Sequence, residues 1–135
     1  MKRLVLLVIL ALCIAGCTKN DPTDPIIGKW ELTDAWGAFE DGTLFVDFQA
    51  GWKTLEFTSS GYVFFDGLTR TEYEKVADDD LIIWTNFQGL LYEDHYIIET
   101  LTDQDLQLHF IDLETIDFVD NSPYHYYYKY KRVNQ

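Results

Sequence analysis

Apolar and polar residues alternate with a period of two along most of the chain from Ile26 onward, a pattern typical of β-strands. Trp30 and Leu32 alternate with charged or hydroxyl-bearing neighbours, and Leu55 and Phe57 do the same. Clusters of Asp, Asn, Ser and Gly separate the alternating segments and favour turns. The pattern predicts strands over 29–33, 44–48, 54–58, 62–65, 70–76, 81–85, 95–101, 106–111 and 124–133.

Eight or nine short strands that follow one another along the chain predict an all-β, antiparallel meander. No heptad repeat and no long stretch of helical periodicity interrupts them. An open meander of this length would leave two strand edges exposed, and closure into a barrel removes both. We therefore expect a small β-barrel that occupies residues 26–135.

The last strand shows which of its faces is buried. Lys129 and Lys131 share one face with His125 and Tyr127, and two lysines mark that face as solvent-exposed. The other face carries four tyrosines, namely Tyr124, Tyr126, Tyr128 and Tyr130. Each inward hydroxyl needs a partner, which is either a guest in a partly wet cavity or neighbouring backbone at the barrel mouth. If a cavity exists, these tyrosines are candidate ligand-binding residues, with Tyr96 or Trp84 as a stacking wall.

The first seventeen residues have the organisation of a secretory signal. Lys2 and Arg3 precede an uninterrupted apolar run over 4–14, which is too short to span a bilayer as a helix. The run ends in Ile14-Ala15-Gly16-Cys17, which resembles a bacterial lipobox, in which the cysteine is diacylated and becomes the new N-terminus. We therefore expect a signal peptide over 1–16, a lipidated Cys17 with a tether over 17–25, and the domain thereafter.

The tether contains no apolar residue except Pro22 and Pro25, which predicts a short, extended spacer. Thr18, rather than Asp, follows the cysteine, which in enteric-type sorting favours the outer membrane. Asp21 and Asp24 resemble the export signals of some surface-displayed lipoproteins. We therefore expect a lipid-anchored protein of the cell envelope, at the outer membrane, on its periplasmic face or at the cell surface.

The charge of the chain excludes several partners. Its 23 acidic residues against 10 basic ones give a formal net charge of −13, which falls to −15 once Lys2 and Arg3 leave with the signal. Such a chain is not expected to bind nucleic acid or to carry a polybasic membrane patch. Cys13 leaves with the signal and Cys17 would carry lipid, so the domain has no disulfide, cysteine nucleophile or thiolate metal site.

Catalytic and metal-binding signatures are missing from the sequence. His95, His109 and His125 show no spacing typical of a metal site, and no nucleophile elbow or phosphate loop is present. The acidic residues at 78–80 and 112–120 lack the glycine and spacing of a calcium loop and favour hydrated turns, although calcium binding stays open. We expect no enzymatic activity, no cofactor and no metal.

Several motifs together resemble the lipocalin-like domain family of bacterial lipoproteins, part of the calycin group of small β-barrels. Gly28-Lys29-Trp30 is similar to the Gly-x-Trp opening of the first strand, and Tyr128-Lys129-Tyr130-Lys131-Arg132 to the aromatic and basic last strand. The family's strand–turn–strand and late hairpin are matched by 55–62 and 96–108. The resemblance implies a lipocalin-like barrel in which Arg132 covers the indole of Trp30 at the closed end, next to Gly28.

The resemblance also favours one of two functions. The first is a lipocalin-like binding module that holds a small amphipathic molecule inside the barrel. The alternative is a protein-interaction or inhibitor module that uses its outer acidic and aromatic surface, with Tyr127 and His125, to dock a basic partner such as the target of a lysozyme inhibitor. An internal void would favour the first function, and a filled barrel the second.

Overall fold

The protein was analysed as a computed structural model that describes residues 21–45, 52–116 and 122–134. The proposed signal peptide, Cys17 and the start of the tether lie outside these residues. The nine strands are β1 (Gly28–Ala38), β2 (Leu44–Phe45), β3 (Thr54–Phe57), β4 (Tyr62–Phe65), β5 (Thr69–Ala77), β6 (Asp80–Phe87), β7 (Leu90–Leu101), β8 (Asp105–Ile116) and β9 (Pro123–Arg132). The described residues form no helix, so the all-β class predicted from the sequence is confirmed.

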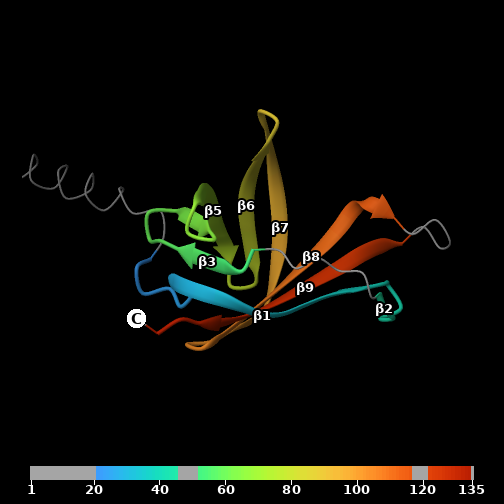
Figure 1. The fold of residues 1–135 in the computed structure, drawn as a ribbon, viewed down its shortest axis with the longest axis horizontal. Coiled ribbons are helices and arrows are strands. Elements are labelled where there is room, and N and C mark those ends of the chain that lie inside the picture. The colour runs from blue at the N-terminus through green and yellow to red at the C-terminus, as the bar shows by residue number, and fades with distance from the viewer. Residues whose placement is uncertain (1–20, 46–51, 117–121, 135) are drawn as a thin grey trace, which may run out of the picture.

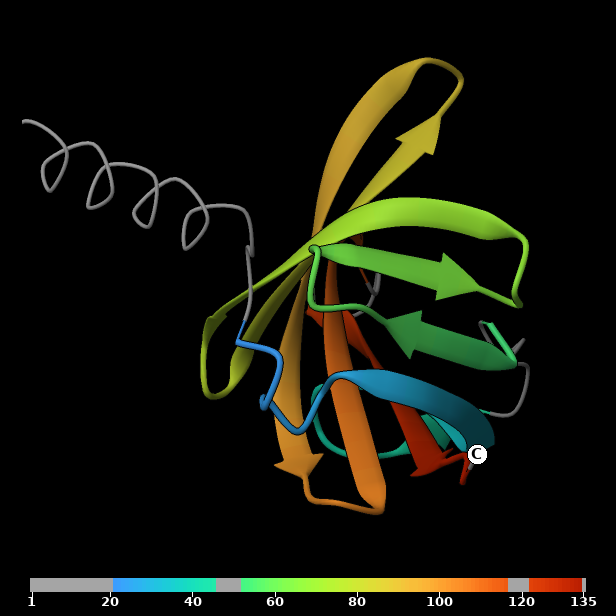
Figure 2. The same cartoon turned by 90° about the vertical axis from the view of Figure 1, so that its left-hand side faces the viewer.

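Eight of these strands form a closed antiparallel barrel, as Figures 1 and 2 show. Neighbours pair in the order β1-β3-β4-β5-β6-β7-β8-β9, and β9 pairs back with β1. The ninth strand, β2, pairs with the far end of β1. The meander closes as predicted, because Trp30 and Glu31 of β1 pair with β3 on one side and with β9 on the other.

Alternate residues of the strands fill the centre of the barrel. Trp30, Leu55 and Phe57 are almost completely buried, as are Val63, Tyr73, Leu81, Ile83, Leu106 and Leu108. Burial of this apolar surface is the main stabilising contribution to the fold. We call this closed part the barrel body.

Two extensions project from the barrel body (Figure 1). The hairpin arm is the end of the β6–β7 hairpin, residues 84–95. The sheet arm consists of residues 111–116 of β8, 123–127 of β9 and 33–38 of β1, with β2 at its edge. β7 and β8 stop pairing beyond Tyr96 and Phe110, so the two arms diverge from that point.

The hairpin arm is longer than the sequence predicted. Strands were expected to end at Thr85 and to resume at His95, yet β6 and β7 continue to a two-residue turn at Gln88-Gly89. Both turn residues have positive φ, 52° and 81°, as a tight hairpin turn requires. The sequence hid this turn because Gln-Gly is a weaker hairpin signal than Asn-Gly, and because residues 90–94 do not alternate.

Candidate functional site

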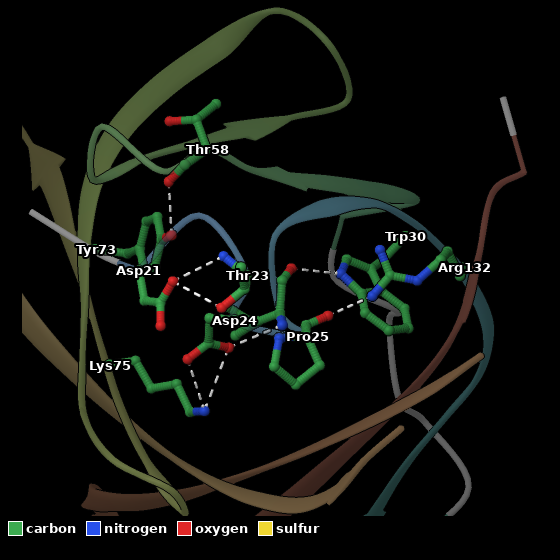
Figure 3. A network of polar contacts seen from close by, with 10 residues as sticks. Asp21, Thr23, Asp24, Pro25, Trp30, Thr58, Tyr73, Lys75 and Arg132 are labelled. Atoms are coloured by element: carbon green, nitrogen blue, oxygen red, sulfur yellow. Dashed lines mark hydrogen bonds and ion pairs between the residues drawn. The ribbon is translucent and has the colours of Figure 1, made fainter. Parts of the chain in front are cut away.

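The contact between Trp30 and Arg132 that the resemblance implies is present at the closed end of the barrel body (Figure 3). The Arg132 guanidinium carbon lies 4.2 Å from the centroid of the indole ring. Arg132 donates hydrogen bonds to the carbonyls of Ile27 (2.8 Å) and Pro25. A side chain at Gly28 would collide with the guanidinium, and the positive φ of 130° there also favours glycine. All the partners of this arrangement are intramolecular, so its role is structural.

The end of the expected tether is part of the same network rather than an extended spacer. Residues 21–27 form two consecutive turns, closed by hydrogen bonds from Asp24 N to Asp21 O and from Ile27 N to Asp24 O. Lys75 Nζ lies 3.0 Å from Asp24 Oδ2, and the lysine side chain is only 11% exposed. Ile26 is buried and accepts a 2.9 Å hydrogen bond from Trp30 Nε1. The expectation of a free spacer is therefore corrected for residues 21–25, since the charge pair and the buried isoleucine hold them on the barrel.

The even-numbered tyrosines of β9, from Tyr124 to Tyr130, lie on the inner face, opposite the exposed Lys129 and Lys131. Tyr130 belongs to the buried core, and its hydroxyl donates to Trp52 O at 3.3 Å. Tyr128 packs against this core, and Tyr96 of β7 is part of it. Burial raises the pKa of Tyr128 to about 12, and burial also raises the pKa values of Tyr96 and Tyr130. These phenols therefore stay neutral over the physiological pH range.

A small cavity lies among the described residues of the barrel body. Its volume is about 10 Å³, and its walls include Trp52, Ile83, Tyr96, Tyr128 and Tyr130. A volume of this size accommodates about one water molecule. Among the candidate ligand-binding residues, Tyr96, Tyr128 and Tyr130 thus meet at one place, but they fill it with their own rings.

The other two candidate tyrosines lie on the sheet arm. Tyr124 contacts the rings of Phe39 and Phe45, with centroid distances of 5.7 and 5.6 Å. Tyr126 contacts Phe45 at 5.8 Å and Phe110 at 6.4 Å. A series of aromatic rings therefore continues from the core along the inner face of this arm.

Trp84 does not join the tyrosines, so its expected role as a stacking wall is corrected. Leu81 and Ile83 of β6 point inward and are buried. Trp84 follows Ile83 directly and so lies on the opposite, outer face of the strand. The sequence-based assignment considered ring chemistry without the alternation of β6.

The outer face at the root of the sheet arm carries a chain of hydrogen-bonded acidic and imidazole groups. His109 Nδ1 of β8 lies 2.8 Å from Glu99 Oε1 of β7, and His109 Nε2 lies 2.8 Å from His125 Nδ1 of β9. His125 Nε2 in turn contacts Glu40, which lies beyond the end of β1. The chain ties four segments of the barrel together, and His109 is the buried polar residue at its centre.

The two ends of this chain lie near solvent and its centre is shielded. The side chains of Glu99 and Glu40 are 38% and 53% exposed, whereas those of His109 and His125 are 10% and 15% exposed.

Aromatic rings stack against this chain of hydrogen-bonded side chains. Tyr127 stacks on His109 at a centroid distance of 4.3 Å and on Trp36 at 5.2 Å, with interplanar angles of 16° and 10°. Lys129 Nζ lies 5.5 Å from the centre of the Trp36 ring. Burial, and then the charges of Glu99 and Glu40, raise the pKa of Tyr127.

Sequence reasoning placed His109, His125 and Tyr127 on outer faces but did not bring them together, because only the strand register makes them neighbours. His95, the third histidine, lies apart and is exposed beside Glu93. Within the described residues, no group of three or more His, Cys, Asp or Glu side chains could hold a metal ion. The same residues include no helix that is long and apolar enough to cross a membrane.

Comparisons with known proteins identified no relative of this chain. No protein-family model, curated protein or solved structure matches the chain.

Proposed function

We propose that the protein is a lipid-anchored, non-catalytic interaction module of the cell envelope, which binds a cationic partner through the acidic surface of its arms. The observation that carries this proposal is the distribution of charge. The arms contain no Lys or Arg and five acidic residues, namely Asp34, Glu93, Asp94, Asp112 and Glu114, and the segment over 76–128 as a whole has 12 Asp and Glu residues and no Lys or Arg. A surface of one sign attracts and orients a partner of the other sign.

The filled barrel also favours this function over an internal ligand. A cavity of about 10 Å³ is far smaller than a small-molecule site, which typically measures about 300–1,000 Å³. Of the groups that the sequence assigned to a guest, Tyr96, Tyr128 and Tyr130 pack together in the barrel body. The barrel then serves as a rigid scaffold for its outer surface.

The anchor and the docked segment 21–27 give the scaffold an orientation. The lipobox-like sequence at Cys17 supports lipidation and placement at the outer membrane. Four residue steps from Cys17 to Asp21 span at most about 14 Å. The closed end of the barrel body would therefore face the membrane, while the sheet arm extends away from that end (Figure 1).

Membrane attachment is tested by substitution of the acylated residue. Cys17→Ser should move the protein to the soluble fraction, because the two acyl chains supply the membrane affinity. If the Cys17→Ser protein still sediments with membranes after a high-salt wash, the lipid anchor is wrong.

Partner binding is tested with a defined basic protein. Titration calorimetry of the full chain in nonionic detergent should detect binding of lysozyme at low salt and its loss at about 0.5 M salt. α-Lactalbumin, an acidic protein of similar size, is the matched control. Equal heats with the two proteins would show that the acidic surface selects no cationic partner.

A second candidate function rests on the ring series of the sheet arm. Tyr124, Tyr126, Phe45 and Phe110 supply apolar faces with hydroxyls beside them, which suits a small amphipathic ligand bound along the arm rather than inside the barrel. Native mass spectrometry of protein purified from its own envelope would detect such a ligand. Its retention in the wild type and its loss in Tyr126→Ala would establish this function.

A further inference from the structure

The point where the arms diverge leaves one edge of β7 without a neighbouring strand. β7 pairs with β8 only from Tyr96 onward, where Tyr96 faces Phe110. Its first six residues, 90–95, pair on one side with β6 in an unbroken register. No strand of the described residues pairs with their other side, and Figure 1 shows β8 leaving in a different direction.

The register shows which amides lie on this edge. The hairpin closes at Phe87 and Leu90 around a two-residue turn, where the closing residues exchange both of their hydrogen bonds. Hydrogen-bonded and non-hydrogen-bonded pairs then alternate along an antiparallel ladder. The backbone N–H and C=O groups of Leu91, Glu93 and His95 therefore point away from β6, toward β8. Such a row is a template for an added strand.

A cleft of about 250 Å³ accompanies this edge. Its walls include Tyr92, Glu93 and Asp94 of β7 and Phe110, Asp112 and Leu113 of β8. The walls therefore combine apolar side chains with carboxylates. Leu91 and Leu113 are 67% and 75% exposed, so apolar surface is available on both sides of the cleft.

We propose that an extended, cationic segment of a partner protein adds to β7 as a further antiparallel strand along residues 90–95. This inference deepens the proposed function and rests on it. Main-chain hydrogen bonds would supply affinity, while the basic face of the added strand would meet Glu93 or Asp94 and its apolar face would meet the leucine on the other face of β7. A second copy of this chain is disfavoured as the occupant, because it would bring the same lysine-free and arginine-free acidic segment to the cleft.

A designed peptide tests the strand addition. The probe is a fluorescein-labelled octapeptide of alternating lysine and valine, titrated by fluorescence anisotropy into the full chain in nonionic detergent. A glutamate–valine octapeptide measures the background. A lysine–valine peptide with N-methyl groups on every internal residue keeps the charge but offers no N–H for strand pairing on either edge. We expect the lysine–valine peptide to bind, and the N-methylated peptide to bind about tenfold more weakly.

Two substitutions at one position separate the backbone from the side chain. Glu93→Pro removes an N–H on the open edge, where proline is tolerated because that N–H does not serve the ladder with β6. Glu93→Thr removes the same charge but keeps the amide. We expect Glu93→Pro to weaken peptide binding about tenfold relative to Glu93→Thr. Because the N-methylated peptide is compared on the unmodified protein, the test stands even if Glu93→Pro impairs folding.

The outcomes distinguish this inference from the proposed function. If the lysine–valine peptide binds equally well with and without N-methyl groups, strand addition is wrong while cationic binding stands. If it binds no better than the glutamate–valine peptide, and lysozyme also fails to bind, the proposed function is wrong as well. A concentration-dependent dimer in sedimentation that Glu93→Pro abolishes would identify a second copy as the occupant and overturn the proposal.

Discussion

The barrel body and the arms are formed by the same strands, but different interactions hold them in place. At the closed end, Trp30 is completely buried beneath Arg132, and the segment 21–27 is fixed there by Lys75. In the arms, leucines such as Leu90 and Leu91 are mostly exposed, and β7 loses one of its two neighbouring strands. Buried apolar contacts stabilise the first region, whereas paired backbone, ring stacking and a chain of polar contacts hold the second.

This difference indicates which part of a small barrel can carry a binding surface. A domain of this size needs most of its apolar side chains for its core, so little volume remains for an internal ligand. Extending β6 to β9 beyond the closed barrel creates new surface without opening the core. The arms can thus carry exposed edges and carboxylates without a nearby basic side chain in their own segments.

The largest effect should come from the closed end. Trp30→Ala should lower the free energy of unfolding by about 3–5 kcal/mol, because it leaves a large cavity in the core. Arg132→Ala should cost less, about 1–2 kcal/mol, through lost stacking over the indole. Urea denaturation measures both effects, and a double-mutant cycle without coupling between them would contradict the contact.

The docked segment should give the next largest effect. Asp24→Ala leaves the ammonium of Lys75 partly buried without its carboxylate, which should cost about 2–3 kcal/mol. Lys75→Met combined with Asp24→Ala should recover part of this loss, because no unpaired charge remains. Equal stability of Asp24→Ala and wild type would show that the segment 21–27 is not held on the barrel.

Alkaline pH should loosen the barrel body through its buried tyrosines. Burial raises the pKa of Tyr128 to about 12, above the value of about 10 in an unfolded chain. A pKa that is higher in the folded state gives stability that is fully present below pH 10 and is lost as pH rises toward 12. At about pH 11, the raised pKa of Tyr128 alone should lower the free energy of unfolding by about 1 kcal/mol. Denaturation at pH 8 and 11 measures the loss, which Tyr128→Phe should reduce.

A smaller effect is expected from the histidine chain at the root of the sheet arm. His109→Leu removes both hydrogen bonds of the central ring while keeping a buried apolar side chain. The global free energy of unfolding should fall by about 1 kcal/mol. The amides of 123–127 should exchange with solvent severalfold faster, because the sheet arm loses its link to Glu99. Unchanged exchange in this segment would mean that the chain of contacts does not hold the arm.

The closed end could be predicted from the sequence because local patterns determine it. Alternation at Trp30 and Leu32 and the lysines of the last strand indicated which residues face inward, and the resemblance implied the partner of Trp30. Residues 21–25 were predicted less well, since the pairing of Asp24 with Lys75 joins positions 51 residues apart. The composition of these residues predicted a polar spacer. It could not show that the fold places a distant, oppositely charged side chain beside one of them.

The arms were harder to predict because their features depend on strand register. His109 and His125 are neighbours only because Ile111 pairs with His125 in the ladder between β8 and β9. The open edge of β7 depends on the direction in which β8 departs, which no single-strand pattern contains. Even Trp84 was assigned to the wrong face, although the burial of Leu81 and Ile83 shows its orientation once β6 is known.

Amide hydrogen exchange with and without a basic protein tests the division into scaffold and recognition surface most directly. In the free protein, amides of the barrel body should exchange only through global unfolding, and amides of residues 84–95 should exchange through smaller openings. Added lysozyme should slow exchange in the arms, including Leu91, Glu93 and His95, and should leave the closed end unchanged. Protection concentrated around Trp30 and Arg132, with none in the arms, would contradict the account.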